Sequence, residues 1–435
     1  MNEKEFDRLL KQDINREKLN TEIAAPVGIV LGVVLVIWPL LACFHAGGLG
    51  TAVGVVLLIA YVLPVYISKA QTFTRDHGLV FLSECIGFAG TAIGCFGLFV
   101  LSPVGMASPI LLGQLYADQG RWSLADKFSK LVKMSEKVAP FVPSSVKMST
   151  SAIVMKTAFH SGRYDEAVKL ARQLAKEAND LYESEDSEQN RETLIVVQSV
   201  VAGYLKILGY NEEAAPLWAR VKSLDDFGTG GRNNSLAYVY DILAFAADYV
   251  GDWQSCLIYS DRALERSSAA RLSSKVLAGE TAAARAQALL ALRRFDEAEA
   301  EAKKSYNAWR TFLFETAFQL SPVYYVMGCV ELERGNYETA SGHLFKAISI
   351  RHFRNGKNHP ELSKMLKAYA QCLRKLARDN EAVQVENELN SLPTTGYAIT
   401  ISSPASIETK VSTNDTSAAA PGAAEQAIID SIDLK

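Results

Sequence analysis

The stretches GRYDEAVKLARQL at 162–174 and GNYETASGHLFKA at 335–347 decide the fold of this 435-residue chain. Each begins with a glycine, has an aromatic residue two positions later and a small residue five positions later, and continues with helix-forming residues. Glycine readily adopts the left-handed turn that ends a helix, and a small side chain lets two helix axes approach closely. Each stretch therefore predicts one helix, a tight turn, and a second helix packed against the first.

The same pattern occurs seven times along the chain, and successive copies are 42 residues apart except for one separation of 47. A single helix pair cannot bury its own apolar stripe, so neighbouring pairs must stack. We therefore predict an all-α fold in which residues 107–390 form a superhelical solenoid of about seven helix pairs. The small residues that mark the copies are Ala125, Ala167, Ala214, Cys256, Ala298, Ala340 and Ala382.

This pattern resembles the tetratricopeptide repeat (TPR) superfamily. The 42-residue period and the string GKNHPELSKMLKAYAQCLRKLARDNEA at 356–382 resemble the kinesin-light-chain subtype, whose repeats carry a similar Asn-His-Pro element before the first helix. The resemblance implies a protein-binding solenoid. It does not extend to the subtype's paired asparagine, because Lys367 and Ala368 occupy those positions, and Arg293 and Arg285 are further departures.

A membrane domain is predicted before the repeats. The chain is 49% hydrophobic and 21% charged, with a mean hydropathy of +0.05. Residues 23–44 and 49–67 contain no charged side chain, and 79–106 contains only Glu84. Each stretch can span about 30 Å of hydrocarbon as a helix. We therefore predict a cytoplasmic segment at 1–22 and a membrane domain at 23–106 with three transmembrane helices in contact with the lipid bilayer.

Glycines within these stretches recur at GxxxG spacing, which lets transmembrane helices approach closely. They predict a packed cluster of helices or a homo-oligomer, and the alternative is that glycine is simply common in such helices. The pairs are Gly28 with Gly32, Gly50 with Gly54, and Gly90 with Gly94.

The distribution of basic residues predicts the orientation. Residues 1–22 carry five lysines and arginines, the turn at 45–48 carries none, and the next loop has Lys69 and Arg75. Cytoplasmic segments are enriched in such residues, so the N-terminus is placed in the cytoplasm. Three crossings would put the solenoid outside the cytoplasm. Two points favour the opposite side: the three cysteines beyond residue 106 cannot all pair, and the third stretch could re-enter without crossing.

Two short motifs resemble processing signals. Leu40-Leu41-Ala42-Cys43 resembles a lipobox, but it follows a segment with six acidic residues where a signal peptide has a short positive start. The string LPTTG at 392–396 resembles a sortase motif but is not followed by a hydrophobic span. We expect neither to be used.

Several function classes are disfavoured. A net charge of −3 argues against nucleic-acid binding, and no CxxC motif or Cys/His spacing suggests a metal or a disulfide framework. There is no phosphate loop, dinucleotide fingerprint, HExxH or GxSxG motif, and the six histidines are scattered, so we expect them on the surface. We therefore predict a protein that is not an enzyme and has no metal or cofactor.

Three charged or biased regions are expected to be solvated. Residues 177–192 carry seven acidic residues, and 351–378 carry eight basic residues with only Glu361 opposing them. Residues 391–435 are rich in Ser, Thr, Ala and Pro and are predicted to be a disordered tail.

The candidate binding site follows from the repeat. In a TPR stack the first helix of each pair lines the concave wall, so helical spacing selects the residues that face it. We predict that a protein or peptide binds there, with apolar side chains on the aromatic residues and an acidic stretch at the basic end. The alternatives are that the aromatic residues only fill the core, or that the protein is an assembly or sensor subunit that contacts its partner through the transmembrane helices. The candidate residues are Tyr238, Asp241, Phe245, Asp248 and Tyr249 in the fourth repeat and Lys364, Lys367, Arg374 and Lys375 in the seventh.

Overall fold

The structure is a computed structural model, and it describes residues 3–46, 85, 107–136, 144–185, 187–224, 233–267, 273–310 and 315–392. The predicted second and third transmembrane helices lie outside these residues apart from Cys85, and so does the predicted tail beyond Leu392.

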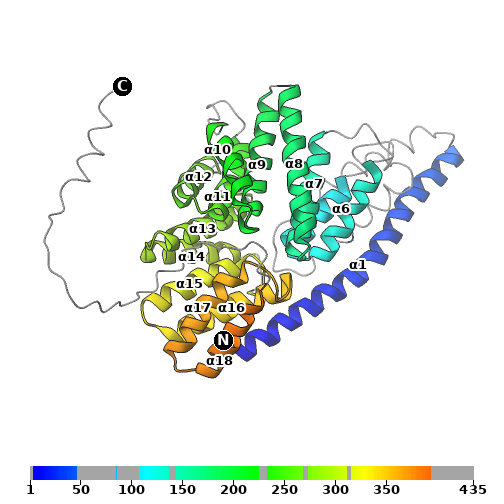
Figure 1. The fold of residues 1–435 in the computed structure, drawn as a ribbon. Coiled ribbons are helices and arrows are strands. Elements are labelled where there is room, and N and C mark those ends of the chain that lie inside the picture. Colours follow the sequence, from blue (N-terminus) through cyan, green and yellow to red (C-terminus); the bar gives the residue numbers. More distant parts are fainter. Residues whose placement is uncertain are drawn as a thin grey trace, which may run out of the picture. The chain divides into compact units, whose positions relative to one another are not determined.

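Fourteen of the described helices form seven consecutive pairs between Ala107 and Ser391 (Figure 1). All regular structure in the described residues is helical, which confirms the predicted all-α solenoid of helix pairs. The pairs are α5 (Ala107–Asp118) with α6 (Trp122–Glu136), α7 (Ser144–His160) with α8 (Tyr164–Ser184), α9 (Glu188–Ile207) with α10 (Asn211–Leu224), α11 (Asn233–Val250) with α12 (Trp253–Ser267), α13 (Ser273–Ala291) with α14 (Phe295–Arg310), α15 (Leu320–Glu333) with α16 (Tyr337–Asn355), and α17 (Leu362–Lys375) with α18 (Asp379–Ser391).

The turn inside each pair is left-handed, as the glycines predict. The five glycines at this position have φ between 70° and 82°. Arg293 and Ala377 occupy the same position in the fifth and seventh pairs and take φ of 59° and 56°, although a side chain disfavours this region by about 1–2 kcal/mol. The hydrogen bonds of the helix ends are nevertheless made, since Arg294 N donates to Leu289 O at 2.9 Å. The geometry of the pair therefore imposes the turn even without glycine.

The two helices of a pair meet at the predicted small residues. All seven, from Ala125 to Ala382, are at most 2% exposed. In the sixth pair the approach is especially close, because a Cβ on Gly328 would lie 2.6 Å from Leu344 Cγ. Successive pairs stack in two ways: first helices pack on first helices, as α9 on α11 and α11 on α13, and second helices pack on the next first helix, as α12 on α13 and α14 on α15.

An additional helix, α1 (Glu3–Ala46), packs along α16. Its side chains are described as far as Val30, and Phe6 and Leu10 are fully buried in the apolar core of the last pairs. Figure 1 shows α1 as one long helix that begins beside the last pairs and extends away from them. The helix has no break at residue 22, where the sequence predicts the start of a separate membrane segment. Among the residues that the structure describes, no helix combines the length and apolar character needed to cross a membrane.

Candidate functional site

The candidate site is the set of first-helix positions that the repeat makes equivalent to the five predicted residues of α11, and we call it the inner face. On α11 these residues run from Tyr238 to Tyr249. The repeat spacing places residues of other first helices at equivalent positions. The inner face therefore also includes Asp118, Lys156, His160, Glu280, Gln287 and Lys364.

The predicted residues of α11 differ in exposure. Tyr238 is 46% and Phe245 is 43% exposed, whereas Asp241 and Asp248 are buried. Tyr249 is half-buried, and its hydroxyl donates to Glu361 Oε1 at 3.0 Å. Two aromatic side chains are thus available at the surface, while the third is held by the protein itself.

Carboxylates gather near Tyr238. Asp241 accepts a hydrogen bond from Thr281 Oγ1 at 2.7 Å, and burial raises the pKa of Asp241 to about 6. Burial, followed by the charges of Asp241 and Asp118, raises the pKa of Glu280 well above its ordinary value. Asp118 lies 3.7 Å from its counter-charge, Lys156 Nζ. A residue of the first pair is therefore within electrostatic reach of the fifth pair.

Asp248 is the most buried acid of the predicted set. Burial raises its pKa to about 6, while Lys364 opposes the shift and Glu361 adds to it. Lys364 Nζ donates to Gln287 Oε1 at 2.8 Å and lies over the ring of Tyr325. The structure therefore brings one predicted basic residue of the seventh repeat close to the predicted fourth-repeat residues.

The remaining basic residues of the predicted set lie on exposed parts of α17. Lys367 and Lys375 are exposed. Arg374 is also exposed, but it forms ion pairs with Asp379 at 3.0 Å and Glu386 at 2.8 Å, both in the second helix of its own pair. An acidic partner would have to compete for Arg374, whereas neither lysine forms an ion pair with another described residue.

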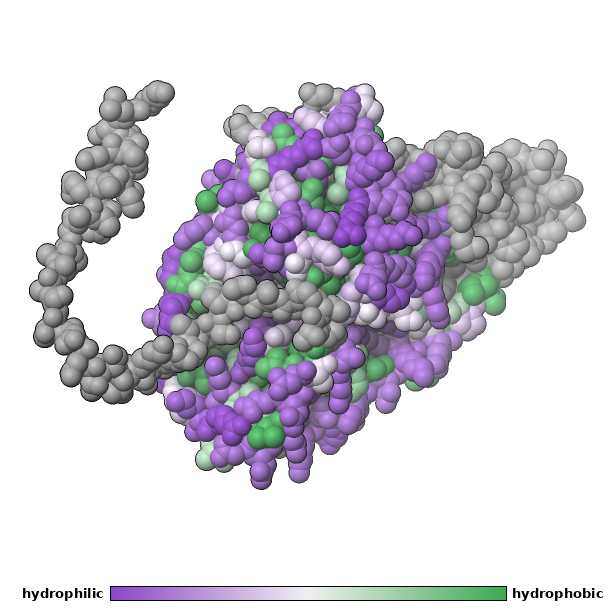
Figure 2. All heavy atoms as spheres, in the orientation of Figure 1, coloured by the Kyte–Doolittle hydropathy of each residue, from purple (hydrophilic) through white to green (hydrophobic). Residues whose placement is uncertain are grey.

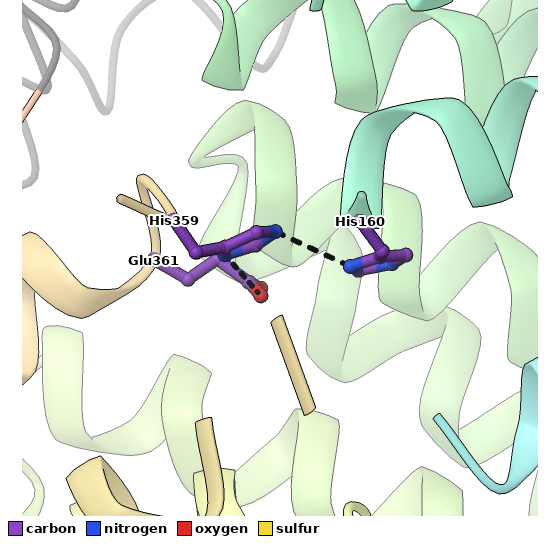
Figure 3. A group of neighbouring side chains, drawn as sticks. All are labelled: His160, His359 and Glu361. Atoms are coloured by element: carbon purple, nitrogen blue, oxygen red, sulfur yellow. Dashed lines mark hydrogen bonds and ion pairs between the residues drawn. The ribbon is translucent and has the colours of Figure 1, made fainter. Parts of the chain in front are cut away.

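A buried polar cluster that the sequence analysis missed joins the second and seventh pairs. His160 ends α7, and His359 and Glu361 precede α17; their exposed fractions are 3%, 0% and 8%. His160 Nδ1 and His359 Nε2 are 3.3 Å apart, and His359 Nδ1 lies 3.6 Å from Glu361 Oε2 (Figure 3). The expectation that histidines lie on the surface is wrong here, because the superhelix brings residues almost 200 positions apart into contact.

Arg351 supplies the positive charge that pairs with the carboxylate of this cluster. Its Nη1 lies 2.7 Å from Glu361 Oε2, and Arg351 itself is 5% exposed, so the basic run at 351–378 is not simply a solvated face. Burial favours a raised pKa for Glu361, but Arg351, His359 and Lys364 outweigh it and the pKa is lowered. Burial lowers the pKa of His359 to about 4, and burial together with the charge of His359 lowers that of His160. Both rings are therefore neutral at pH 7.

The three donor residues lie close enough together to raise the question of a metal ion. Figure 3 shows His359 between the other two, with opposite ring nitrogens directed at Glu361 and His160. One ion cannot use both nitrogens of a single imidazole ring, and the Arg351 guanidinium already neutralises Glu361. As arranged, the cluster fits a hydrogen-bonded structural link better than a ligand set.

Further contacts close the same junction. Tyr164 OH donates to Asn358 O at 3.0 Å, and the Trp122 ring stacks on His160 at 4.1 Å between centroids. The repeat period could have indicated part of this arrangement, since His160 and Asp118 occupy the position of Tyr249 in the second and first copies. Nothing local in the sequence indicates that His160 meets His359.

The described outer surface is mainly polar on the face that Figure 2 shows, where hydrophobic residues form separate spots. On a second helix, α16, the aromatic residue Phe353 is 42% exposed. Isolated apolar residues of this kind are normal at protein surfaces.

These features define the class of protein: an α-solenoid of TPR-like helical repeats. Two solved structures are similar to this chain. BtubC (BKLC) from P. vanneervenii is 16% identical with a TM-score of 0.37, covering 59% of this chain and 97% of that one. The apo form of RapI is 14% identical with a TM-score of 0.41, covering 66% and 75%. No protein-family model matches the chain, and no curated protein matches it. The assignment of the fold therefore rests on the repeat geometry itself.

Proposed function

We propose that this protein is a membrane-anchored scaffold that binds a protein partner on the inner face of its solenoid. The observation that carries the proposal is the exposure of Tyr238 and Phe245 on α11, among inner-face groups that are otherwise buried or hydrogen-bonded. Aromatic side chains at such positions supply much of the affinity of protein interfaces. TPR-like solenoids are suited to this role because stacked repeats present an extended surface.

The surrounding charges favour particular partner residues. The carboxylate of Asp241 near Tyr238 favours a basic residue beside the apolar contact. The exposed Lys367 and Lys375 favour an acidic stretch at the seventh pair. Exposed ion pairs contribute only about 0.2–1 kcal/mol each, so the lysines should mainly affect the association rate and its salt dependence.

Anchoring is supported by the sequence, which has three stretches of spanning length at 23–44, 49–67 and 79–106. The kinesin-light-chain subtype is likewise proposed from the Asn-His-Pro element at 358–360. The alternative function is an assembly or sensor subunit that contacts its partner through GxxxG faces of its transmembrane helices, of which only Gly28 lies among the described side chains.

The binding role is proposed in place of catalysis. Catalytic motifs are lacking in the sequence, and the cluster of His160, His359 and Glu361, the group of three such side chains that lie together in the described residues, is buried. A substrate atom would need to come within about 3 Å of such a group, which its burial prevents.

The test is a double substitution, Tyr238→Ala with Phe245→Ala, in the full chain. Tyr249 is left intact because it bonds to Glu361 and packs against Gly203. Partners captured from solubilised membranes are identified by mass spectrometry, and we expect the specific partner to be lost. The control is Phe353→Ala, which removes an aromatic residue of similar exposure from α16 and should retain capture.

Circular dichroism must show that the helices persist in both variants. Unchanged capture by the folded double variant would exclude the inner face. Loss of capture only when the GxxxG glycines are replaced would favour the assembly or sensor subunit.

A further inference from the structure

We infer that the N-terminal segment and the solenoid lie on the same side of the membrane, so that the chain crosses it an even number of times between residues 23 and 106. The inference rests on the proposed membrane anchoring. It comes from the contacts that α1 makes with the solenoid. The sequence alone places the residues of α1 in a segment separate from the repeats.

The first turns of α1 share the apolar core of the solenoid. Phe6 and Leu10 are 0% exposed and belong to the cluster formed by the last three pairs. The Phe6 ring meets Tyr324 edge-on at 6.3 Å between centroids, and Lys346 Nζ lies 5.6 Å from the centre of the Phe6 ring. These turns are therefore part of the folded repeat domain.

Polar contacts continue along α1 toward residue 22. Thr316 Oγ1 donates to Asp13 Oδ2 at 2.6 Å, and Arg354 donates to both carboxylate oxygens of Glu17 at 2.7 and 2.8 Å. Arg121 then donates to Thr21 Oγ1. The side chain of Arg354 is only 7% exposed, so Glu17 supplies the counter-charge of a buried cation.

The apolar part of α1 begins directly after these contacts. Four large apolar side chains there are between 46% and 61% exposed, and the uncharged run that starts with them continues to residue 44. The occupant that fits this exposed apolar face is the hydrocarbon of a bilayer, because the uncharged sequence of 22 residues is long enough as a helix to match its thickness of about 30 Å. The exposed residues are Ile23, Val27, Ile29 and Val30.

A bilayer cannot separate two parts of a chain whose side chains are in van der Waals contact. The docked segment and the solenoid must therefore share a compartment, which requires an even number of crossings. This disfavours three crossings with the solenoid on the far side.

The compartment follows from the charge of the docked segment. Its five basic residues favour a position in the cytoplasm. The solenoid, which shares its compartment, then also lies in the cytoplasm. Independently, Cys256, Cys329 and Cys372 are buried free thiols, which is typical of a reducing compartment. The partner of the inner face is then a cytosolic protein.

The test compares the accessibility of two positions in the full chain in intact cells. Lys11→Cys lies on α1 and Asp296→Cys on α14, where the native side chains are 62% and 95% exposed. A membrane-impermeant maleimide should label neither variant until the membrane is permeabilised, and then label both. The parent chain gives the background from native cysteines.

Labelling of only one position in intact cells would overturn the inference. Labelling of both in intact cells would support a shared side but overturn the cytoplasmic assignment. A second measurement is oxidation of Asp13→Cys with Thr316→Cys in membranes, where we expect a cross-link that Lys11→Cys with Thr316→Cys does not give. Absence of that cross-link in a folded, membrane-embedded variant would overturn the docking.

Alkaline carbonate extraction separates this inference from the proposed function. Release of the chain would refute membrane anchoring and the inference with it. Retention in the membrane together with opposite labelling of the two positions would refute the shared side alone.

Discussion

Arg354 donates hydrogen bonds from Nη1 and Nη2 to the two carboxylate oxygens of Glu17, at 2.7 and 2.8 Å, across 337 residues of sequence. This ion pair holds α1 against α16, the second helix of the sixth helix pair. Arg354 is buried, and burial alone would lower its pKa, but Glu17 outweighs this effect and keeps the pKa raised.

Glu17→Gln should destabilise the protein because it removes the hydrogen-bonded counter-charge of the buried Arg354 guanidinium. Since Glu17 is itself 23% exposed, we expect a loss of about 2–4 kcal/mol in the free energy of unfolding. The measurement is denaturant unfolding of the solubilised full chain. Lys11→Gln is the matched control on the same helix: its ion pair with Asp7 is exposed, so its loss should cost less than about 0.5 kcal/mol. Equal effects of the two substitutions would contradict the assigned role of Glu17.

Ala377→Gly should stabilise the protein. Ala377 is held at a φ of 56°, and glycine relieves a strain of about 1–2 kcal/mol while adding freedom to the unfolded chain, so we expect a net gain of about 0.5–1 kcal/mol. The reverse change at the equivalent turn, Gly335→Ala, should lower stability by about 1 kcal/mol, since its φ is 81°. Thermal unfolding of both variants measures this. A destabilised Ala377→Gly variant would show that the turn is not strained.

Asp248→Asn should stabilise the protein at pH 7 and have little effect at pH 4. The folded-state pKa of Asp248 is raised to about 6, so the native state binds more protons than the unfolded state between about pH 4 and 6, and stability falls as the pH rises through this window. Removing the charge should recover about 1–3 kcal/mol at pH 7. Asp252→Asn is the contrasting control, because hydrogen bonds from Trp218 and Ser255 lower the pKa of Asp252 despite its partial burial. That variant should be destabilised at pH 7; stabilisation of both would argue against a burial penalty specific to Asp248.

His359→Gln should reduce the decrease in the free energy of unfolding that occurs as the pH falls into the acid range. The pKa of His359 is lowered to about 4, so between pH 6.5 and 4 the unfolded state binds more protons and stability is lost as the pH falls. The parent should lose up to about 1.4 kcal/mol per pH unit from this residue, and the variant should not. Unfolding free energies at several pH values test this. Above pH 7.5 the two curves should run parallel, and parallel curves over the whole range would show that His359 titrates normally.

The repeat architecture could be predicted because its signals are local and periodic. A turn residue, an aromatic residue and a small residue recur within six positions, and each acts within its own helix pair. Helix pairs and buried small residues therefore followed from the sequence. The predicted binding face of α11 stays a prediction, in which Tyr238 and Phe245 are exposed and Asp241 and Asp248 are buried.

The contacts between distant repeats were decided only by the tertiary structure. The meeting of His160 with His359, and of Glu17 with Arg354, depends on the rotation that accumulates from one pair to the next and on where α1 docks. A local pattern determines each rotation only approximately, and the error grows over several repeats. For that reason histidines and arginines expected in solvent are buried against partners far away in sequence, whereas the turns and small residues of each pair lie where the sequence places them.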